Sequence, residues 1–337
     1  MNVTTIGIDL AKSVFQLHGV DAAGEGVVRK KLRRAAVLES LRGLRPCLIG
    51  MEACATAHFW GREIGALGHE VRLIPAAYVK PYVKRQKNDS ADAEAICEAV
   101  TRPNMRFVPV KRAERQGVLM LHRTRDLLMR RRPMTLNAVR SHLAEFGIIT
   151  AQGPHKILTL IRAGEVPGLP PIACAALESM ATQLDTLASE IRRLERLLMA
   201  WHRADETSQR LETIPGVSII TATALAAGVP DPSVFQTCRQ FAAFLGLVPR
   251  QNPSGGKDRL GRISKMGDGY LRRLLVVGAT SVIRRADSNP SATGTRVRGL
   301  LERKPARLVA VAVANKTARI AWVILARGET YRAPMTA

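Results

Sequence analysis

The stretch TTIGIDLAKSVFQLHGV, residues 4–20, decides the fold of the first part of the chain. Its first six residues form an apolar run that ends at Asp9, which is typical of a buried strand. Residues 13–20 predict a second strand, and GVVRKKL, residues 26–32, a third, joined to the second by a turn around DAAGEG. The chain therefore begins with three strands in succession.

Helix and strand patterns alternate after the third strand. A helix is predicted over residues 35–44, an apolar strand, CLIGME, over residues 47–52, a second helix over residues 57–67 and a fifth strand over residues 70–74. A further helix is expected from about Ser90. This order predicts an α/β domain with a mixed five-stranded sheet and helices against its faces.

Length and charge limit the class of protein. The chain has 337 residues, of which 46% are hydrophobic, enough for about two domains with real cores. Its 51 Lys and Arg against 28 Asp and Glu give a formal net charge of +23. Such an excess favours a polyanionic partner, with nucleic acid ahead of an anionic membrane.

Several other classes of site are disfavoured. The five cysteines show no CxxC spacing and the seven histidines no HxxxH spacing, which argues against zinc and against a disulfide framework. Seven Phe, three Trp and four Tyr are too few to favour a stacking platform for single strands. The sequence shows no run of about 20 apolar residues and no signal-peptide pattern, so we expect a cytoplasmic protein outside the membrane.

Four carboxylates form the strongest chemical pattern. Asp9 and Glu52 each end an apolar strand, and Asp89 and Asp92 lie three residues apart at the start of a helix. If the two strands are neighbours, both carboxylates emerge at one edge of the sheet, where ligands commonly bind. Four hard oxygen ligands suit Mg²⁺ or Mn²⁺ acting on phosphate. Acids in a first helical turn are also common for structural reasons alone.

The middle of the chain predicts long helices. Residues 101–140 carry 11 Lys or Arg against two acids, which indicates a nucleic-acid contact surface or a solvated helical face. Further on, apolar residues recur at alternating spacings of three and four, the a/d seam of a coiled coil. We favour self-association through this seam; the alternative is a long amphipathic helix packed on its own domain. The seam residues are Leu177, Met180, Leu184, Leu187, Ile191, Leu194, Leu198 and Trp201.

We divide the chain into residues 1–150, an acidic-site domain with basic helices, residues 151–206, a coiled-coil segment, and residues 207–337, a mostly helical domain. The last part opens with LETIPGVSIITATALAA, which predicts a helix-hairpin-helix whose turn, at Gly216, holds a phosphate. An ordinary helix turn would have the same pattern.

One serine in this last domain has an unusual setting. Ser254 precedes two glycines in NPSGGKDRLGRISKMGDGYLRR, residues 252–273. A mobile basic surface loop would have this sequence, and so would a nucleophile that meets a phosphate. No histidine follows His202, so a local Ser-His pair is absent and a helper must come from elsewhere. The surrounding cations, which we predict to contact nucleic acid, are Lys257, Arg259, Arg262, Lys265, Arg272 and Arg273.

These segments, taken in order, resemble the DEDD transposases of the IS110 insertion-sequence family, in its IS1111-like branch. IGIDLAKSVFQLHGVD, IGMEACATAHFW and KNDSADAEAI resemble the RuvC-like, RNase H-fold half, and FAAFLGLVPRQNPSGGKDRLGRISKMGDGYLRRLLVVGA resembles the C-terminal transposase domain. The resemblance covers nearly the whole chain. It implies that Asp9, Glu52, Asp89 and Asp92 are the acidic tetrad and that Ser254 is the nucleophile.

The resemblance also implies an activity and partners. It implies a recombinase that excises and inserts its element through a covalent 5′-phosphoserine intermediate and strand exchange. A structured bridge RNA would pair with donor and target DNA and guide the reaction, and the protein would act as a dimer or a dimer of dimers.

Three other functions remain open at this point. A nuclease of the RNase H fold that resolves DNA junctions would use the carboxylates for hydrolysis, with Ser254 as part of a loop. A repressor would bind nucleic acid without catalysis. GIDLAKS is also faintly similar to the phosphate-binding strand of sugar-kinase and actin-type ATPases, although the glycines that admit a nucleotide phosphate are missing after Asp9.

Overall fold

The computed structural model describes residues 2–84, 89–150, 153–162, 168–254, 257–288 and 291–333. For residues 154, 155, 252–254, 257–259 and 292 the description is of the backbone alone. The chain divides into two units, Met1–Gln116 with Val229–Gln236, and Gly117–Gly228 with Thr237–Ala337. The long helices thus cluster with the C-terminal part in this division, while the three-part functional division stays a prediction.

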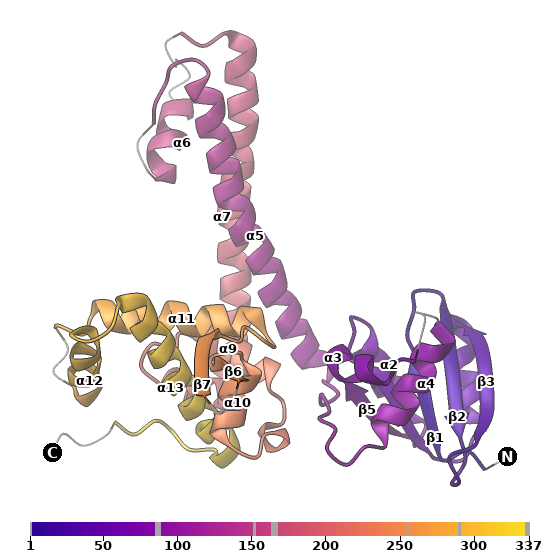
Figure 1. The fold of residues 1–337 in the computed structure, drawn as a ribbon. Helices are drawn as coiled ribbons and strands as arrows, with labels where there is room; N and C mark the ends of the chain where they lie inside the picture. The colour runs from indigo at the N-terminus through magenta and orange to yellow at the C-terminus, as the bar shows by residue number, and fades with distance from the viewer. Residues whose placement is uncertain are drawn as a thin grey trace. The chain divides into compact units, whose positions relative to one another are not determined.

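A mixed five-stranded sheet forms the centre of the first unit (Figure 1). Its strand order is β3-β2-β1-β4-β5. β1, β4 and β5 run parallel, and β2 pairs antiparallel with both β1 and β3. The predicted mixed sheet is therefore confirmed, and β1 and β4 are neighbours as the interpretation of the carboxylates required. The strands are β1 (Thr5–Asp9), β2 (Val14–Val20), β3 (Gly26–Arg33), β4 (Leu48–Glu52) and β5 (Glu70–Ile74).

Helices cover both faces of this sheet. One face packs on α1 and α2 through a core that includes Ile8, Ile49 and Trp60. The other face packs on α4, whose Ile96 and Val100 are fully buried. The helices of this unit are α1 (Val37–Arg42), α2 (Ala57–Ala66), α3 (Ala76–Val79) and α4 (Asp89–Val100), with short 3-10 turns at Arg34–Ala36, Lys80–Tyr82 and Pro232–Val234.

Two glycines bring α4 unusually near to the sheet. A Cβ at Gly7 of β1 would lie 2.2 Å from the Ala93 carbonyl oxygen and 2.4 Å from the Cys97 backbone nitrogen. A Cβ at Gly50 of β4 would lie 2.8 Å from Cβ of Val100. Any larger residue at these positions would push the helix away, since real Cβ atoms do not approach so closely.

Three helices form an antiparallel arrangement that includes the predicted seam (Figure 1). The seam lies on α7 (Pro171–Ala204), which packs on α6 (Pro154–Arg162) and on α5 (Ala113–Ala144). Arg125 of α5 and Glu195 of α7 form an ion pair at 2.6 Å. The described seam residues are thus covered by the same chain, as in the alternative of an amphipathic helix on its own domain. Self-association stays a prediction. The most buried seam residues are Leu177, Leu184, Ile191, Leu194 and Leu198.

The C-terminal part of the second unit is mostly helical, as predicted, but it also contains a β hairpin that was not. The hairpin consists of β6 (Pro249–Ser254) and β7 (Lys257–Ile263). The alternative of a mobile basic loop therefore does not fit the paired backbone of residues 249–254 and 257–263. The helices are α8 (Glu206–Glu212), α9 (Ile219–Gly228), α10 (Cys238–Phe244), α11 (Gly269–Arg284), α12 (Ala292–Leu301) and α13 (Ala306–Arg327).

One of these helices, α13, is long and apolar enough to cross a membrane by length and composition. Asn315, Lys316 and Arg319 interrupt its apolar residues, so the sequence still has no continuous run of about 20 of them. α13 packs on α10, α11 and α12, and Ala314, Ala318 and Ala321 on it are fully buried. Part of the helix, including these alanines, thus lies in the interior of the C-terminal part.

Candidate active site

Three of the four predicted carboxylates come together at the end of β1. One ligand oxygen from each of Asp9, Asp89 and Asp92 lies within 4.8 Å of the others. Asp9 and Asp92 are half-buried and Asp89 is exposed. Residues about eighty positions apart in sequence therefore lie together. We call these three residues the acidic cluster.

Local structure explains why these three groups meet. Gly7 and Asp9 lie on the same face of β1 because side chains alternate along a strand, and this is the face on which α4 packs. Asp89 and Asp92 lie in the first turn of α4 and share one side of the helix. The close approach at Gly7 therefore sets how near Asp9 lies to the start of α4.

The fourth carboxylate, Glu52, is the last residue of β4 and lies at the same end of the parallel strands as Asp9, but outside the acidic cluster. Ile8 of β1 pairs with Met51 of β4, so Asp9 and Glu52 follow at the same level on adjacent parallel strands, about 4.8 Å apart. Gly50 faces α4, and alternation places Glu52 on that same face. All four carboxylates thus belong to one edge and one face of the sheet.

The oxygen spacing fits a divalent cation. Mg²⁺ holds oxygen ligands at about 2.1 Å in an octahedron, so two of its ligands lie at most about 4.2 Å apart. The 4.8 Å spread within the acidic cluster needs only a small side-chain adjustment to match this. A set made of carboxylates alone favours Mg²⁺ or Mn²⁺ over zinc.

Lys84, which the sequence analysis did not single out, forms an ion pair with Glu94 of α4. Its Nζ donates to Oε1 of Glu94 at 2.9 Å, and this contact lowers the pKa of the Glu94 carboxyl. Arg29 of β3 approaches the other oxygen of Glu94 at 3.8 Å. In sequence Lys84 belongs to a run of cations that looks like a solvated face, so no local signal identifies this role.

Ser254 is the last residue of β6 and is paired with Lys257, the first residue of β7. The predicted serine therefore lies at one end of the paired strands. Gly255 and Gly256 lie outside the described residues, as do the side chains of Ser254, Lys257 and Arg259.

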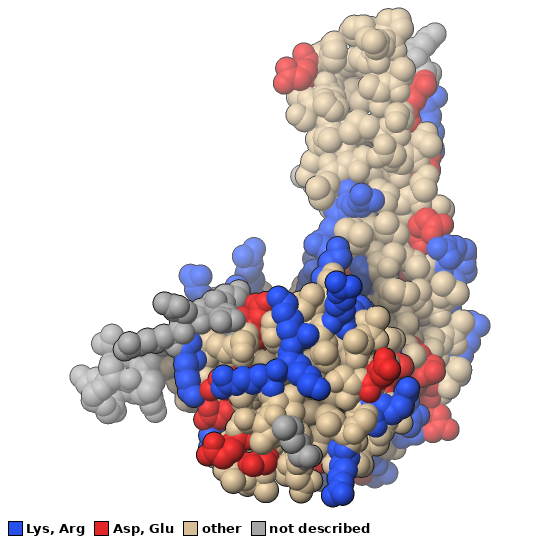
Figure 2. All heavy atoms as spheres, turned by 90° about the vertical axis from the view of Figure 1, so that its right-hand side faces the viewer, with Lys and Arg blue, Asp and Glu red and all other residues tan. Residues whose placement is uncertain are grey.

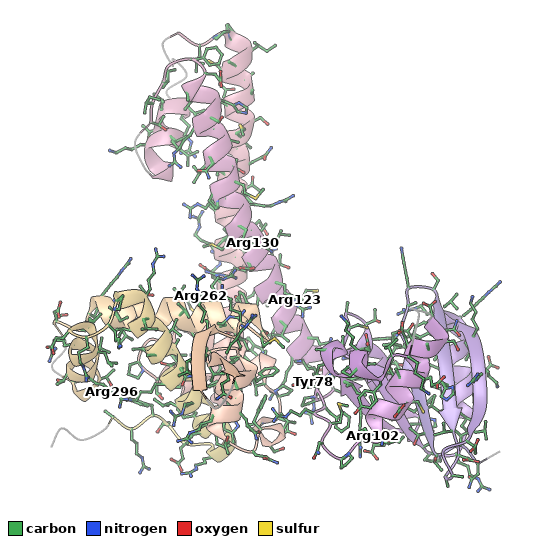
Figure 3. The ribbon with its side chains drawn as sticks, in the orientation of Figure 1. Tyr78, Arg102, Arg123, Arg130, Arg262 and Arg296 are labelled. Carbon is green, nitrogen blue, oxygen red and sulfur yellow. The ribbon has the colours of Figure 1, made fainter. Side chains whose placement is uncertain are left out.

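The other predicted cations of this region fall into two groups. Arg262 on β7, labelled in Figure 3, and Lys265 are exposed. Arg272 instead donates to the carbonyl oxygens of Leu245 at 2.9 Å and Met266 at 2.7 Å. Arg272 therefore fixes the loop before α11, and its contact with nucleic acid stays a prediction.

Arg273 also has partners within its unit. It forms an ion pair with Asp126 of α5 and lies 5.3 Å from the ring centre of Tyr270. Its guanidinium thus joins α11 to α5, although half of the side chain remains exposed. A phosphate would have to compete with Asp126 for this group.

Gly216 has a structural reason for its identity. It lies between α8 and α9 with φ of 84°, and a Cβ there would meet the Gly278 carbonyl oxygen of α11 at 2.9 Å. Any side chain would be strained at this φ and would separate the turn from α11. Close packing alone thus accounts for the glycine, and phosphate binding at the turn stays a prediction.

A basic strand, β3, lies two positions from β1 in the sheet. β3 is an edge strand, and its Arg29, Lys30, Lys31 and Arg33 are exposed. The side on which β3 lies in Figure 1 faces the viewer in Figure 2, where Lys and Arg are prominent on the near surface. Cations protect an exposed edge against pairing with other strands, and they also suit contact with a phosphate backbone.

Two families of known proteins match this chain and show its class. Residues 6–148 match a DEDD transposase family of the IS110 type. Residues 208–293 match the family described as Transposase IS116/IS110/IS902 family. The fold, the acidic edge and these matches together make the protein a DNA transposase.

Relatives that align with nearly the whole chain show which family it belongs to. A probable family 20 transposase of Pseudomonas aeruginosa is 49% identical over 98% of this chain and 99% of its own. The transposase for insertion sequence element IS1328 of Yersinia enterocolitica is 42% identical over 98% and 99%. That for IS1111A of Coxiella burnetii is 39% identical over 98% and 92%. The chain belongs to the IS116/IS110/IS902 family of transposases.

Proposed function

We propose that this transposase excises and inserts its element by attack of Ser254 on the DNA backbone, a 5′-phosphoserine intermediate and strand exchange. The observation that carries the proposal is the acidic cluster at the end of β1, in a chain whose family cuts and rejoins DNA. The strand order of the sheet supports an RNase H-like, RuvC-like fold for this unit.

Asp9, Asp89 and Asp92, with Glu52 from the adjacent strand, would hold Mg²⁺ or Mn²⁺. When bound, such ions stabilise the charge that develops on phosphate oxygens during displacement at phosphorus. The carboxylates themselves provide a negatively charged edge that favours cation binding in an otherwise basic protein. The α4 N-terminus partly balances their mutual repulsion, because its backbone N–H groups carry partial positive charge.

Ser254 would act as the nucleophile. Its Oγ forms a bond to phosphorus, the bond from phosphorus to the 3′ oxygen breaks, and the serine proton is transferred so that a free 3′ hydroxyl leaves. A 3′ hydroxyl from another strand then attacks the phosphoserine, which restores the serine and forms a new phosphodiester. The ester conserves the energy of the broken bond, whereas hydrolysis would lose it.

The partners in this proposal are donor and target DNA and a structured bridge RNA. Basic residues on both units, among them Lys30 of β3 and Arg262 of β7, are exposed and suited to backbone phosphates. Base pairing by the RNA would then supply sequence recognition. We propose that nucleic acid brings Ser254 and the acidic cluster to the same phosphodiester in a dimer or dimer of dimers in the cytoplasm.

A trapping experiment tests the serine. Wild-type protein, incubated with Mg²⁺, bridge RNA and a DNA substrate nicked near the junction, should accumulate a covalent protein–DNA adduct on a denaturing gel. Ser254→Ala should abolish the adduct, while Ser281→Ala, at an exposed serine of α11, should retain it. Strand cleavage by Ser254→Ala at the wild-type rate would indicate a hydrolytic nuclease and contradict the proposal.

A binding experiment tests the carboxylates separately. Free Mn²⁺ can be followed by electron paramagnetic resonance during titration of the protein. Asp9→Asn and Asp92→Asn should each weaken Mn²⁺ binding at least tenfold, because each removes one charged ligand. Glu39→Gln, at an exposed carboxylate of α1, should bind as wild type does. Equal binding by all four proteins would exclude the acidic cluster as the metal site.

A further inference from the structure

The C-terminal part of the second unit contains a cavity that the transposase mechanism does not use. It has two compartments, of about 160 Å³ and about 670 Å³. The compartments adjoin, because Arg296, Ala312, Lys316, Ile320 and Tyr331 line both. The cavity involves α12, α13, the turn before α9 and the segment that follows α13; Arg296 of α12 is labelled in Figure 3.

The smaller compartment is mainly apolar. Its lining includes Ile214, Val282, Val297, Leu300 and Val313. A volume of this size matches cavities of about 150 Å³ that accept a benzene ring. Thr293 and Thr317 supply hydroxyl groups among the apolar side chains. The compartment thus suits a flat ring with polar substituents on its edge.

The larger compartment is cationic. Arg296, Lys316, Arg319 and Arg332 line it, against one acid, Glu329. Among the residues that the structure describes, none of these four cations forms an ion pair. Burial, and to a lesser extent Arg296, lowers the pKa of Lys316. Cations gathered in a concave surface create a potential that attracts an anion.

The wall that joins the two compartments is held in place. The backbone nitrogen of Tyr331 donates to Oγ1 of Thr213 at 2.9 Å, and Nη1 of Arg210 donates to the Gly328 carbonyl oxygen at 3.1 Å. The segment after α13 is therefore tied to α8 and to the residue that follows it. This places an aromatic residue, Tyr331, at the boundary between the apolar and the cationic compartments.

We propose that this cavity binds one unstacked nucleotide of a nucleic-acid strand, with its base in the small compartment and its phosphate in the large one. An apolar slot the size of a ring beside a group of cations matches a nucleotide, which joins a flat base to an anion. A bare phosphate would leave the apolar slot unused. The inference rests on the proposed function only in taking the partner to be nucleic acid.

The test uses the full-length protein and a short single-stranded oligonucleotide carrying one 2-aminopurine. Affinity is measured by anisotropy, and the environment of the base by 2-aminopurine fluorescence, which changes when the base leaves its stack. Lys316→Gln removes a cation that lines both compartments. Ala312→Leu fills space at an exposed helix position while keeping a good helix former.

Matched controls lie on the same helix outside the cavity. Arg327→Gln removes an exposed cation and Ala326→Leu enlarges an exposed alanine, both on α13. We expect Lys316→Gln and Ala312→Leu each to weaken binding about tenfold, the loss of one good contact, and to abolish the fluorescence change. The controls should stay within about twofold of wild type, and thermal unfolding should show that all four variants fold.

Each other result overturns the inference. Equal behaviour of cavity and control variants would show that the cavity holds no part of the strand. Displacement of the oligonucleotide by an equal concentration of a nucleoside monophosphate would indicate a site for free nucleotides. The trapping experiment reads a covalent adduct at Ser254 and this experiment reads binding at α12 and α13, so failure of one is distinguishable from failure of the other.

Discussion

Gly7 controls the geometry of the candidate active site from a position that carries no chemistry. It lies opposite Ala93 and Cys97 of α4, at distances where a Cβ would overlap backbone atoms. Because α4 also carries Asp89 and Asp92, a change in the distance between helix and strand changes the spacing of the acidic cluster. Packing and the spacing of the acidic cluster are therefore coupled at one residue.

Gly7→Ala tests this coupling. We expect α4 to move away, with a loss of about 1–3 kcal/mol in the free energy of unfolding from overpacking and weaker Mn²⁺ binding. Gly65→Ala is the control, because a Cβ at Gly65 of α2 would meet no atom within 4 Å and alanine favours helix. Urea denaturation and Mn²⁺ titration measure both effects; undiminished Mn²⁺ binding in a destabilised Gly7→Ala would separate packing from the site.

His122 is a buried base within the second unit. Its Nδ1 lies 3.0 Å from the Tyr270 hydroxyl and its Nε2 lies 3.1 Å from Oγ1 of Thr223. Burial, with a smaller contribution from Arg125, lowers the pKa of His122 to about 4. The imidazole is therefore neutral in the folded protein at neutral pH and joins α5 to α9 and α11 by polar contacts.

This lowered pKa predicts a loss of stability in acid. Below pH 6.5 the unfolded chain binds a proton at this histidine that the folded protein does not bind until about pH 4. The free energy of unfolding should fall over that interval by about 3 kcal/mol at most. His122→Gln should show a smaller fall between about pH 7 and pH 4.5 in urea denaturation, and His142→Gln, exposed on the same helix, the wild-type fall. Parallel curves for wild type and His122→Gln would contradict the assignment.

At the scale of helices and strands, sequence patterns predicted the features that depend on residues close together in the chain. The first five strands follow from short apolar runs bounded by turns, and Asp9 and Glu52 follow from where those runs end. The β6–β7 hairpin escaped because PRQNPS and KDRLGRI contain few apolar residues. Among their described side chains, Arg250, Gln251, Leu260 and Arg262 are exposed, so these positions give no alternation of buried and exposed residues.

Contacts between distant segments could not be predicted in the same way. The acidic cluster depends on the helix contact at Gly7, and the position of Glu52 beside it depends on β1 and β4 being neighbours. A single sequence states neither contact. The spacing on α7 predicts an apolar seam but not which helix fills it. The cations of the α12–α13 cavity are spread from residue 296 to residue 332 and form no motif.

A pair of leucines on α7 tests what fills the seam. Leu184 is 3% exposed and Leu197 is 44% exposed. If α5 and α6 of the same chain cover the seam, Leu184→Ala should cost about 2–5 kcal/mol and Leu197→Ala about 0.5 kcal/mol or less. Urea denaturation at several protein concentrations measures this. A cost at Leu184 that depends on concentration would show that the seam is filled by a second chain.

At the scale of the whole molecule, the charge of +23 is concentrated in particular segments. Residues 101–140 hold 11 cations against two acids. Arg123 and Arg130 lie seven residues apart on α5, both exposed (Figure 3), so they share one side of the helix. Met120, Leu127 and Met134 are exposed at the same spacing. α5 thus exposes both cations and apolar side chains to solvent.

The salt dependence of DNA binding tests whether α5 is a contact surface. Each phosphate contact adds about 0.9 to the slope of log affinity against log salt concentration. Replacing Arg123 and Arg130 together by Gln should therefore lower the slope by about 2. Replacing Arg192 and Arg196, exposed on α7 outside the basic stretch, should change it little. If both double variants lower the slope equally, DNA binding depends on the total charge of the protein. A contact surface on α5 would instead make the α5 variant differ from the α7 variant.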